Sequence, residues 1–357
     1  MGHRSSPLNN PIYFGEITIK WIATMRIFVT GATGFIGYAI VRDLVGAGHQ
    51  VTGLVRSADA AARLEAVGAK AQRGTIEDPE NLSRGAAVAD GVIHTAFSHA
   101  FSQASLSTRL RVMFGGGPAD IVKRFTAAAV ETDRRAIEAF GTALRGEDRP
   151  LVIAFPTMAM AQGLLAIEAD TADPTAVGGL RAPSEKAALT LVAHGIRASI
   201  VRLPPSVHDE IRQGLVTQLI AIARKKRISA YIGDGKNRWA AVHRLDASHL
   251  FRLALENGNA GARYHAVAEQ GIPFHDIAEA IGRQLGVRIM ALPHEEASGH
   301  FGWLAPFVAA DNPVSSQATQ ERLSWQPTHP RLMADIAVAL QDGQSSAVTA
   351  YLRERRT

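Results

Sequence analysis

The stretch Arg26-Ile27-Phe28-Val29-Thr30-Gly31-Ala32-Thr33-Gly34-Phe35-Ile36-Gly37 decides the fold of this chain. It passes from an apolar, β-rich run into three glycines spaced G-x-x-G-x-x-G, and then into a segment with helical apolar spacing. Glycine lets the backbone turn tightly after a parallel strand and approach a pyrophosphate closely, and the next helix points free N–H groups at the phosphates. The order of strand, glycine turn and helix therefore predicts a dinucleotide-binding unit. The residues expected to hold the dinucleotide here are Gly31, Thr33, Gly34, Phe35, Ile36 and Gly37.

The composition excludes several other classes of function. The chain has 357 residues, of which 46% are hydrophobic and 20% charged, as in ordinary globular proteins with room for about two domains. It has no cysteine, so disulfides, thiolate metal sites and a cysteine nucleophile are excluded. The 13 histidines show no ligand spacing such as H-E-x-x-H, so no metal is expected.

The charge balance fits a small anionic ligand better than a nucleic acid. The formal net charge is +5, and the charges are dispersed along the chain. The densest basic cluster, Arg224-Lys225-Lys226-Arg227, falls at the expected end of a helix, where cations complement the helix dipole. We therefore expect no nucleic-acid partner, while a mildly basic protein suits a polyanionic dinucleotide.

Residues 1–24 precede the first expected strand. They contain no charged start followed by a sustained apolar core and a cleavage site, so we do not expect a signal peptide. No apolar run approaches the roughly 18 residues that a membrane span needs. Met25 is a candidate natural start, which would make residues 1–24 an extension, and the protein is expected to be cytoplasmic with no membrane partner.

The second β-α unit indicates which dinucleotide is bound. Residues 35–47 are expected to form a helix, residues 49–55 a strand and residues 58–67 a further helix. In NAD-binding units an acidic residue usually closes this strand and bonds the ribose hydroxyls. Here Val55, Arg56 and Ser57 stand in that place, and Arg56 could pair with a 2′-phosphate. This pattern favours NADP over NAD, the alternative being that Arg56 is a surface charge.

The remaining units continue the same rhythm. Asp78 could accept a hydrogen bond from an adenine amino group, but capping the helix after Pro79 explains it equally well. Ala96 and Phe97 follow an expected strand, at the sheet edge where open α/β sheets bind ligands, while His94 within that strand is expected to be a satisfied core histidine. We expect irregular structure over 98–117, ending in a mobile glycine-rich loop at Gly115–Pro118. The other expected elements are strands over 69–73, 91–96, 151–155 and 197–203, a long helix or two over 119–144, and a helix from Pro183 to about His194.

With these residues in view, the chain resembles the extended, epimerase-like branch of the short-chain dehydrogenase/reductase superfamily. The carriers are the motif from Thr30 to Gly37, the β-α rhythm, and the later stretch Gly233-Asp234-Gly235-Lys236-Asn237-Arg238-Trp239-Ala240-Ala241-Val242-His243-Arg244-Leu245-Asp246. The resemblance implies an α/β fold: a Rossmann doubly wound parallel sheet with a smaller C-terminal α/β substrate lobe. It also implies homodimerisation through the long helix before the fifth strand and the helix that carries Lys186.

The resemblance also implies a catalytic set, and this chain departs from it. Family members use a Ser or Thr after strand five and a Tyr-x-x-x-Lys pair, in which Tyr exchanges a proton and Lys binds the nicotinamide ribose. Thr157 matches the hydroxyl and Lys186 the lysine, which puts Ala182 in the place of Tyr. None of the five tyrosines of the chain is followed by Lys four residues later. The chain therefore looks like an atypical member that lacks the usual acid.

If the protein is an enzyme, the proton must come from elsewhere. The candidates are Ser184, Tyr231, His208 and His243, or a water relay through Thr157 and Lys186, and each of the four side chains also has a plain structural explanation. Arg181 and Glu185 could replace the electrostatics of the Tyr-Lys pair, or they could form a solvated helix face.

The expected division is an extension (1–24), a dinucleotide-binding domain (25–203, plus returning segments near 240–268) and a mainly substrate-binding lobe (204–357). Arg238 matches an arginine that grips a phosphate in sugar-nucleotide members, but Trp239 and His243 differ from those relatives. The aromatic patch from His300 to Phe307 could wall a substrate pocket or pack the lobe. As a pocket wall it would suit an apolar carbonyl compound.

Two classes of function follow from the sequence. The first is an NADP-dependent oxidoreductase that moves a hydride to or from a carbonyl or alcohol carbon of a small, rather apolar molecule, with a nucleotide-sugar epimerase or dehydratase as a variant. The second is a non-catalytic NADP-binding sensor, which the absence of Tyr at Ala182 would suit.

Overall fold

The computed structural model describes residues 24–98, 105–115, 117 and 121–341. Most of the predicted extension and part of the predicted loop ending at Gly115–Pro118 lie outside these residues. Within the described ranges no helix is both long and apolar enough to cross a bilayer.

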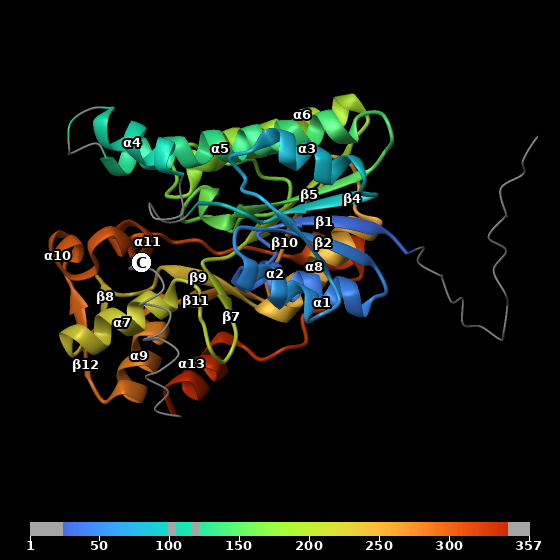
Figure 1. The fold of residues 1–357 in the computed structure, drawn as a ribbon. Coiled ribbons are helices and arrows are strands. Elements are labelled where there is room, and N and C mark those ends of the chain that lie inside the picture. The colour runs from blue at the N-terminus through green and yellow to red at the C-terminus, as the bar shows by residue number, and fades with distance from the viewer. Residues whose placement is uncertain (1–23, 99–104, 116, 118–120, 342–357) are drawn as a thin grey trace, which may run out of the picture.

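A seven-stranded parallel sheet forms the centre of the molecule (Figure 1). The strand order is β10-β6-β5-β4-β1-β2-β3, and every neighbouring pair runs parallel. This order places β1 and β4 side by side at the point where the connections reverse direction, which is where doubly wound sheets bind ligands. The strands are β1 (Arg26–Thr30), β2 (Gln50–Val55), β3 (Lys70–Arg73), β4 (Gly91–His94), β5 (Pro150–Pro156), β6 (Arg197–Leu203) and β10 (Arg263–His265).

Helices cover both faces of this sheet, because its central strands are apolar on both sides. Figure 1 shows α3, α5 and α6 on one face, and α1, α2 and α8 on the other. The predicted fold class is therefore confirmed. The helices are α1 (Phe35–Gly46), α2 (Ala58–Glu65), α3 (Pro79–Ala87), α4 (Leu106–Phe114), α5 (Ile121–Leu144), α6 (Ala182–Thr190) and α8 (Arg244–Asn257).

Helix α4 contradicts the prediction of irregular structure over 98–117. Ser105 caps it by accepting a hydrogen bond from the Thr108 N–H at 3.2 Å. Glu77, from the loop after β3, accepts from the Ser105 N–H at 2.8 Å and from the Thr108 hydroxyl at 3.0 Å. A partner almost thirty residues away thus fixes the start of this helix.

A smaller C-terminal part packs beside the carboxyl edge of the large sheet (Figure 1). Its strands form a three-stranded sheet, β11-β9-β7, and a two-stranded sheet, β12-β8, around an apolar core of its own. The strands are β7 (Ser206–His208), β8 (Ile228–Ile232), β9 (Arg238–His243), β11 (Glu269–Pro273) and β12 (Arg288–Leu292), and the helices are α7 (Val216–Lys226), α9 (Phe274–Leu285), α10 (Ala297–Phe301), α11 (Ala305–Ala309), α12 (Gln317–Leu323) and α13 (Leu332–Gln341). Short 3-10 turns occupy 157–159, 179–181, 191–194, 294–296 and 302–304.

Candidate functional site

The glycine turn sits directly against the residues that follow β4. Gly31 has a φ of +71°, and a Cβ added there would lie 2.6 Å from the Thr95 hydroxyl oxygen and 2.9 Å from the Ala96 nitrogen. A side chain at this position would therefore be strained and would also collide with Thr95 and Ala96. Ala96 and Phe97, predicted to lie near the dinucleotide, are both half-buried, and Ala96 lies directly beside this turn.

The other two glycines leave the start of α1 open to a ligand. Gly34 is the N-cap of α1 and provides no side-chain cap to the first N–H groups. A Cβ on Gly37 would collide with the carbonyl oxygen of Gly31, so the helix can approach the turn only with glycine there. A helix start without a side-chain cap, directly after a strand and a tight glycine turn, is the geometry that accepts a pyrophosphate. The residues present therefore fit a dinucleotide. Thr33, Phe35 and Ile36 are half-buried around the turn.

Three predicted cofactor residues lie at the ends of β2 and β3. Arg56 follows β2 and is exposed. Ser57 caps α2 by accepting from the Ala60 N–H at 3.2 Å. Asp78 caps α3 by accepting from the Asn81 N–H at 3.0 Å, which confirms its predicted capping role and accounts for its carboxylate without adenine.

Two arginines that the sequence analysis had not singled out lie over Phe35 in the glycine turn. The guanidinium carbon of Arg212 is 4.8 Å from the Phe35 ring centroid, and that of Arg244 is 4.9 Å from it. Buried Asp209 forms an ion pair with Arg244 at 2.9 Å. These groups add positive charge next to the start of α1. No spacing in the sequence could reveal them, because Phe35 and Arg244 come from distant parts of the chain.

A buried polar chain runs from β1 to the start of α6. The Thr30 hydroxyl is 2.6 Å from His94 Nδ1, and His94 Nε2 is 3.0 Å from Asp133 Oδ1 on α5. The other oxygen of Asp133 accepts from Arg181 Nη2 at 3.1 Å. Burial opposes the ionisation of Asp133, but Arg181 and His94 outweigh it and hold the pKa of this carboxyl below its usual value. The prediction that His94 is a satisfied core histidine is confirmed.

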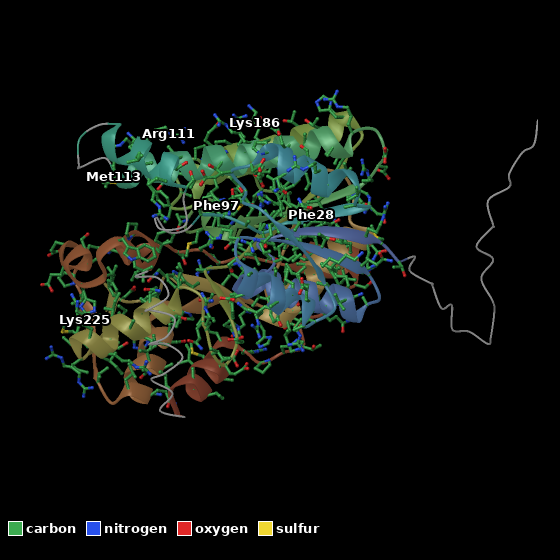
Figure 2. All side chains as sticks on the ribbon, viewed as in Figure 1. Phe28, Phe97, Arg111, Met113, Lys186 and Lys225 are labelled. Atoms are coloured by element: carbon green, nitrogen blue, oxygen red, sulfur yellow. The ribbon has the colours of Figure 1, made fainter. Side chains whose placement is uncertain are left out.

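This series of hydrogen-bonded side chains holds the guanidinium of Arg181 at the carboxyl ends of β4 and β5. Arg181 also donates to the Ala154 carbonyl of β5 at 3.0 Å, and it lies 4.2 Å above the ring of Phe97. Its side chain keeps 16% of its surface exposed, so it is anchored by these contacts without being fully buried. Figure 2 shows Phe97 at this edge of the sheet.

Thr157 and Lys186 do not meet at this edge. Thr157 is fully buried, and its hydroxyl donates to Asn312 Oδ1 at 2.8 Å, while the Asn312 amide donates back to the Thr157 carbonyl at 3.0 Å. Lys186 is exposed and lies on the outer side of the α5–α6 layer (Figure 2). The catalytic role of Thr157 and the catalytic and cofactor roles of Lys186 stay predictions.

The inward face of α6 carries different residues. Arg181 and Glu185 are four positions apart and so share one face, whereas Lys186 is turned by about 100° from Glu185. Glu185 is buried and pairs with Arg202 at 2.6 Å and with Arg263 at 3.1 Å. The positions from which a Tyr-x-x-x-Lys pair would face the sheet therefore hold Arg181 and Glu185.

The other candidate proton donors occupy varied places. Ser184 is buried on α6 beside Asp133. His208 on β7 binds Asp335 of α13 at 2.6 Å through Nδ1. His243 caps α8, and burial lowers its pKa. Tyr231 on β8 packs against His275 at 4.9 Å. Of these four, Ser184 alone lies beside the series of hydrogen-bonded side chains that ends at Arg181.

Arg238, the residue matched to a phosphate-gripping arginine, is held by a carboxylate. Asp311 accepts from Arg238 Nε at 2.9 Å, from Nη2 at 2.7 Å and from the backbone N–H at 2.7 Å. Arg238 bonds hold the pKa of Asp311 below its usual value against the effect of partial burial.

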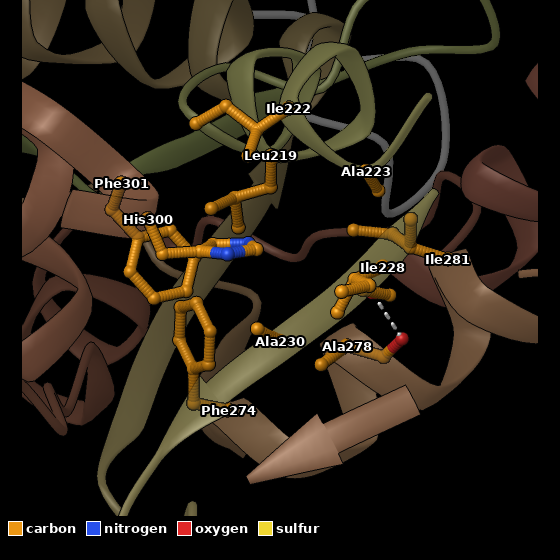
Figure 3. A pocket seen from close by; sticks show the side chains of 11 residues that line it. Leu219, Ile222, Ala223, Ile228, Ala230, Phe274, Ala278, Ile281, His300 and Phe301 are labelled. Carbon is orange, nitrogen blue, oxygen red and sulfur yellow. Dashed lines mark hydrogen bonds between the residues drawn. The ribbon is translucent and has the colours of Figure 1, made fainter. Parts of the chain in front are cut away.

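The aromatic segment from His300 to Phe307 divides between packing and exposure. His300 and Phe301 line a small cavity with Phe274 and apolar side chains of α7, β8 and α9 (Figure 3). Its volume of about 10 Å³ is no more than that of one water molecule, so it is no substrate pocket. Trp303, by contrast, has 60% of its surface exposed. Within the described ranges, no group of three or more side chains could hold a metal ion.

Comparisons with known proteins agree with this architecture. Residues 27–131 match the model of the NAD dependent epimerase/dehydratase family. Uncharacterized protein C2A9.02 of Schizosaccharomyces pombe is 46% identical over 314 residues, which cover 88% of this chain and 98% of that protein. A 4-hydroxy-2-methyl-3-oxo-4-farnesyl-3,4-dihydroquinoline-1-oxide ketoreductase of Stigmatella aurantiaca is 26% identical over 249 residues, 67% of each chain.

The fold also matches solved structures of this group. The dTDP-glucose 4,6-dehydratase DesIV of Streptomyces venezuelae, solved with NAD and DAU bound, superposes with a TM-score of 0.65 at 18% identity, covering 90% of this chain and 98% of that one. At that identity the likeness shows the fold alone. Taken with the glycine turn, the family match leads to one conclusion: residues 27–131 belong to the NAD dependent epimerase/dehydratase family, and the whole chain belongs to the same family as the Schizosaccharomyces pombe protein.

Proposed function

We propose that this protein is an NADP-dependent oxidoreductase that transfers a hydride to a carbonyl carbon of a small, rather apolar molecule, with Arg181 binding the carbonyl oxygen. The observation that carries the proposal is the anchored guanidinium of Arg181 at the carboxyl ends of β4 and β5, beside the glycine turn. The similarity to a protein named as a ketoreductase supports a reductase over other activities of the family.

The glycine turn and the start of α1 would hold the pyrophosphate, and Arg212 and Arg244 beside Phe35 add a favourable field for a polyanion. When bound, the dinucleotide supplies the hydride. Arg56 stands at the end of β2, where NAD-binding units usually carry an acidic residue, and this supports NADP over NAD.

Arg181 is suited to stabilise negative charge that develops on a substrate oxygen. Asp133 and the Ala154 carbonyl engage its Nη2, and Phe97 packs against the guanidinium, so the group is held in place before substrate arrives. A preorganised donor aimed at a developing oxyanion is worth about 100-fold or more in rate.

Two alternatives receive less support. A nucleotide-sugar epimerase or dehydratase would need cations for the sugar-nucleotide phosphates, and the matching Arg238 is already bound at Nε and Nη2 by Asp311. A non-catalytic sensor would not need an anchored cation at the sheet edge. A sensor can be told from an enzyme by experiment, because a sensor binds the dinucleotide without converting any substrate.

The test is a panel of carbonyl compounds with NADPH, monitored by the loss of nicotinamide absorbance, beside equilibrium titrations of NADPH and NADH. We expect saturable NADPH binding, weaker NADH binding, and turnover of apolar aldehydes, ketones or enones. Binding without turnover of any carbonyl compound would favour the sensor, and turnover of a sugar nucleotide alone would favour the epimerase.

A further inference from the structure

The surroundings of Arg181 lack an acid that could complete a proton transfer, among the side chains that the structure describes. Tyr38 lies on α1 beneath Arg63, at 5.1 Å. The hydroxyl of buried Tyr264 accepts a hydrogen bond from the Asn259 N–H at 2.9 Å. With Tyr231 on β8 in the C-terminal part, no tyrosine of the described ranges stands beside Arg181.

Apart from Ser184, the polar groups that neighbour Arg181 are engaged elsewhere. The buried Ser184 hydroxyl lies beside Asp133, and as an alcohol it is no stronger an acid than the alcohol that reduction of a ketone would form. Both ring nitrogens of His94 are bonded, to the Thr30 hydroxyl and to Asp133. The Thr157 hydroxyl donates to Asn312. Asp133 is held as a carboxylate, which accepts protons in hydrogen bonds but has none to give.

A guanidinium stabilises an anion but keeps its own proton, because its pKa stays above about 12. Hydride addition to an isolated ketone leaves an alkoxide, a strong base that needs a proton from a positioned acid. Hydride addition to the β carbon of a conjugated carbonyl leaves an enolate instead. The negative charge of the enolate is spread over oxygen and carbon, so the enolate is a weaker base than an alkoxide and can take its proton from water.

We propose that the substrate of this site is an α,β-unsaturated carbonyl compound, reduced at its carbon–carbon double bond while Arg181 holds the carbonyl oxygen as an enolate. This inference rests on the proposed function and narrows its substrate class. The hydride, which bound NADPH would supply by breaking its C–H bond at nicotinamide C4, forms a C–H bond at the β carbon. The π pair of the alkene then joins the α carbon to the carbonyl carbon, and the carbonyl π pair moves to the oxygen. The α carbon takes a proton from water, leaving hydroxide, so the alkene has gained the two electrons that NADPH would give up on becoming NADP⁺. The ring of Phe97, 4.2 Å from the guanidinium, gives the site an aromatic surface for a planar conjugated molecule.

The experiment compares 2-cyclohexen-1-one with cyclohexanone in the full-length protein with NADPH. We expect kcat/KM for the enone to exceed that for the ketone by about 100-fold or more, the scale of a missing general acid. The product should be cyclohexanone, carrying deuterium at the β carbon from NADPH labelled at nicotinamide C4 and at the α carbon from D₂O. The rate should not fall as the pH rises from about 7 to 10, the range in which a catalytic tyrosine would lose its proton.

Three results would overturn the inference: equal turnover of the ketone, an allylic alcohol as product, or a fall in rate with a single pKa in that range. Each of these leaves the proposed function standing. No turnover of any carbonyl compound, with NADPH still bound, would overturn both.

Arg181→Tyr made together with Asp133→Asn provides the matched variant, because it places a proton donor where the guanidinium stands and leaves no buried charge unpaired. The enone-to-ketone preference should fall by about 10-fold or more in this variant. NADPH affinity and the thermal melting midpoint, measured alongside, show whether the variant is folded, and Arg145→Gln, exposed beyond the end of α5, is the control with unchanged preference. An unchanged preference in the folded double variant would also overturn the inference.

Discussion

Arg56 is the single residue on which the choice between the two dinucleotides rests. It is exposed after β2, while the neighbouring Ser57 is occupied in capping α2. Hydrogen bonds to a charged group contribute about 1.5–3 kcal/mol, so a 2′-phosphate held by Arg56 is worth about 10-fold or more in affinity.

Arg56→Ala is therefore expected to weaken NADPH binding by about 10-fold while NADH binding changes little. Fluorescence titration of both dinucleotides measures this, with Arg145→Ala at the opposite edge of the sheet as the matched control. If NADH and NADPH bind the unaltered protein equally, the role of Arg56 is refuted.

Arg181 and Asp133 must be considered as a pair at this same scale. Removing one partner of a buried ion pair leaves the other charge uncompensated, at a cost of about 3–5 kcal/mol. Variants of Arg181 are therefore best made with Asp133→Asn, so that a loss of activity is not a loss of folding.

At the scale of elements, the edge strand β10 is attached through a buried histidine that must stay neutral. Arg202 Nη1 lies 3.1 Å from His265 Nε2, so this nitrogen accepts, while Nδ1–H donates to the Ser315 carbonyl at 2.7 Å. Burial and the adjacent Arg202 lower the pKa of His265 to about 4, although Glu168 and Asp170 act in the opposite direction. The cluster also contains Glu185 and Arg263, which face Arg202 from α6 and from β10 itself.

The lowered pKa predicts an acid-sensitive fold. Below the ordinary value of 6.5 the unfolded chain binds a proton at His265 that the folded chain refuses, so stability falls as the pH drops from about 6.5 towards 4. Urea unfolding at pH 7.5 and pH 5 should show a loss on the order of 2 kcal/mol that is smaller in His265→Gln. An identical pH dependence in the two proteins would contradict this account.

Elements were predictable from the sequence where their signals are local. Gly31, Gly34 and Gly37 identify the turn because strand, glycine and helix signals adjoin one another, and the apolar run of β5 identifies a buried strand. Helix α4 was missed because Glu77, from the loop after β3, fixes its start.

The candidate site was harder to predict than the elements. A match on Lys186 differs from one on Glu185 by a single residue, yet on a helix this turns the side chain from the sheet to the solvent. The chain from Thr30 through His94 and Asp133 to Arg181 joins four elements, and no spacing in the sequence encodes it.

At the scale of the whole molecule, the strand order explains why these groups meet. β1, β4 and β5 are neighbours and parallel, so the glycine turn, Phe97 and the Ala154 carbonyl all lie at one edge of the sheet. The C-terminal part stands beside that edge, and its loop after β7 brings Arg212 to Phe35. The dinucleotide cradle and the anchored guanidinium are therefore products of one topology.

The most direct test of the central claim is kcat/KM together with the NADPH dissociation constant in Asp133→Asn/Arg181→Gln, using the carbonyl compound that the unaltered protein reduces fastest. If Arg181 binds the substrate oxygen, kcat/KM should fall by about 100-fold or more while the dissociation constant of NADPH changes by less than about threefold. Unchanged turnover, or a loss that lies wholly in NADPH binding, would contradict the account.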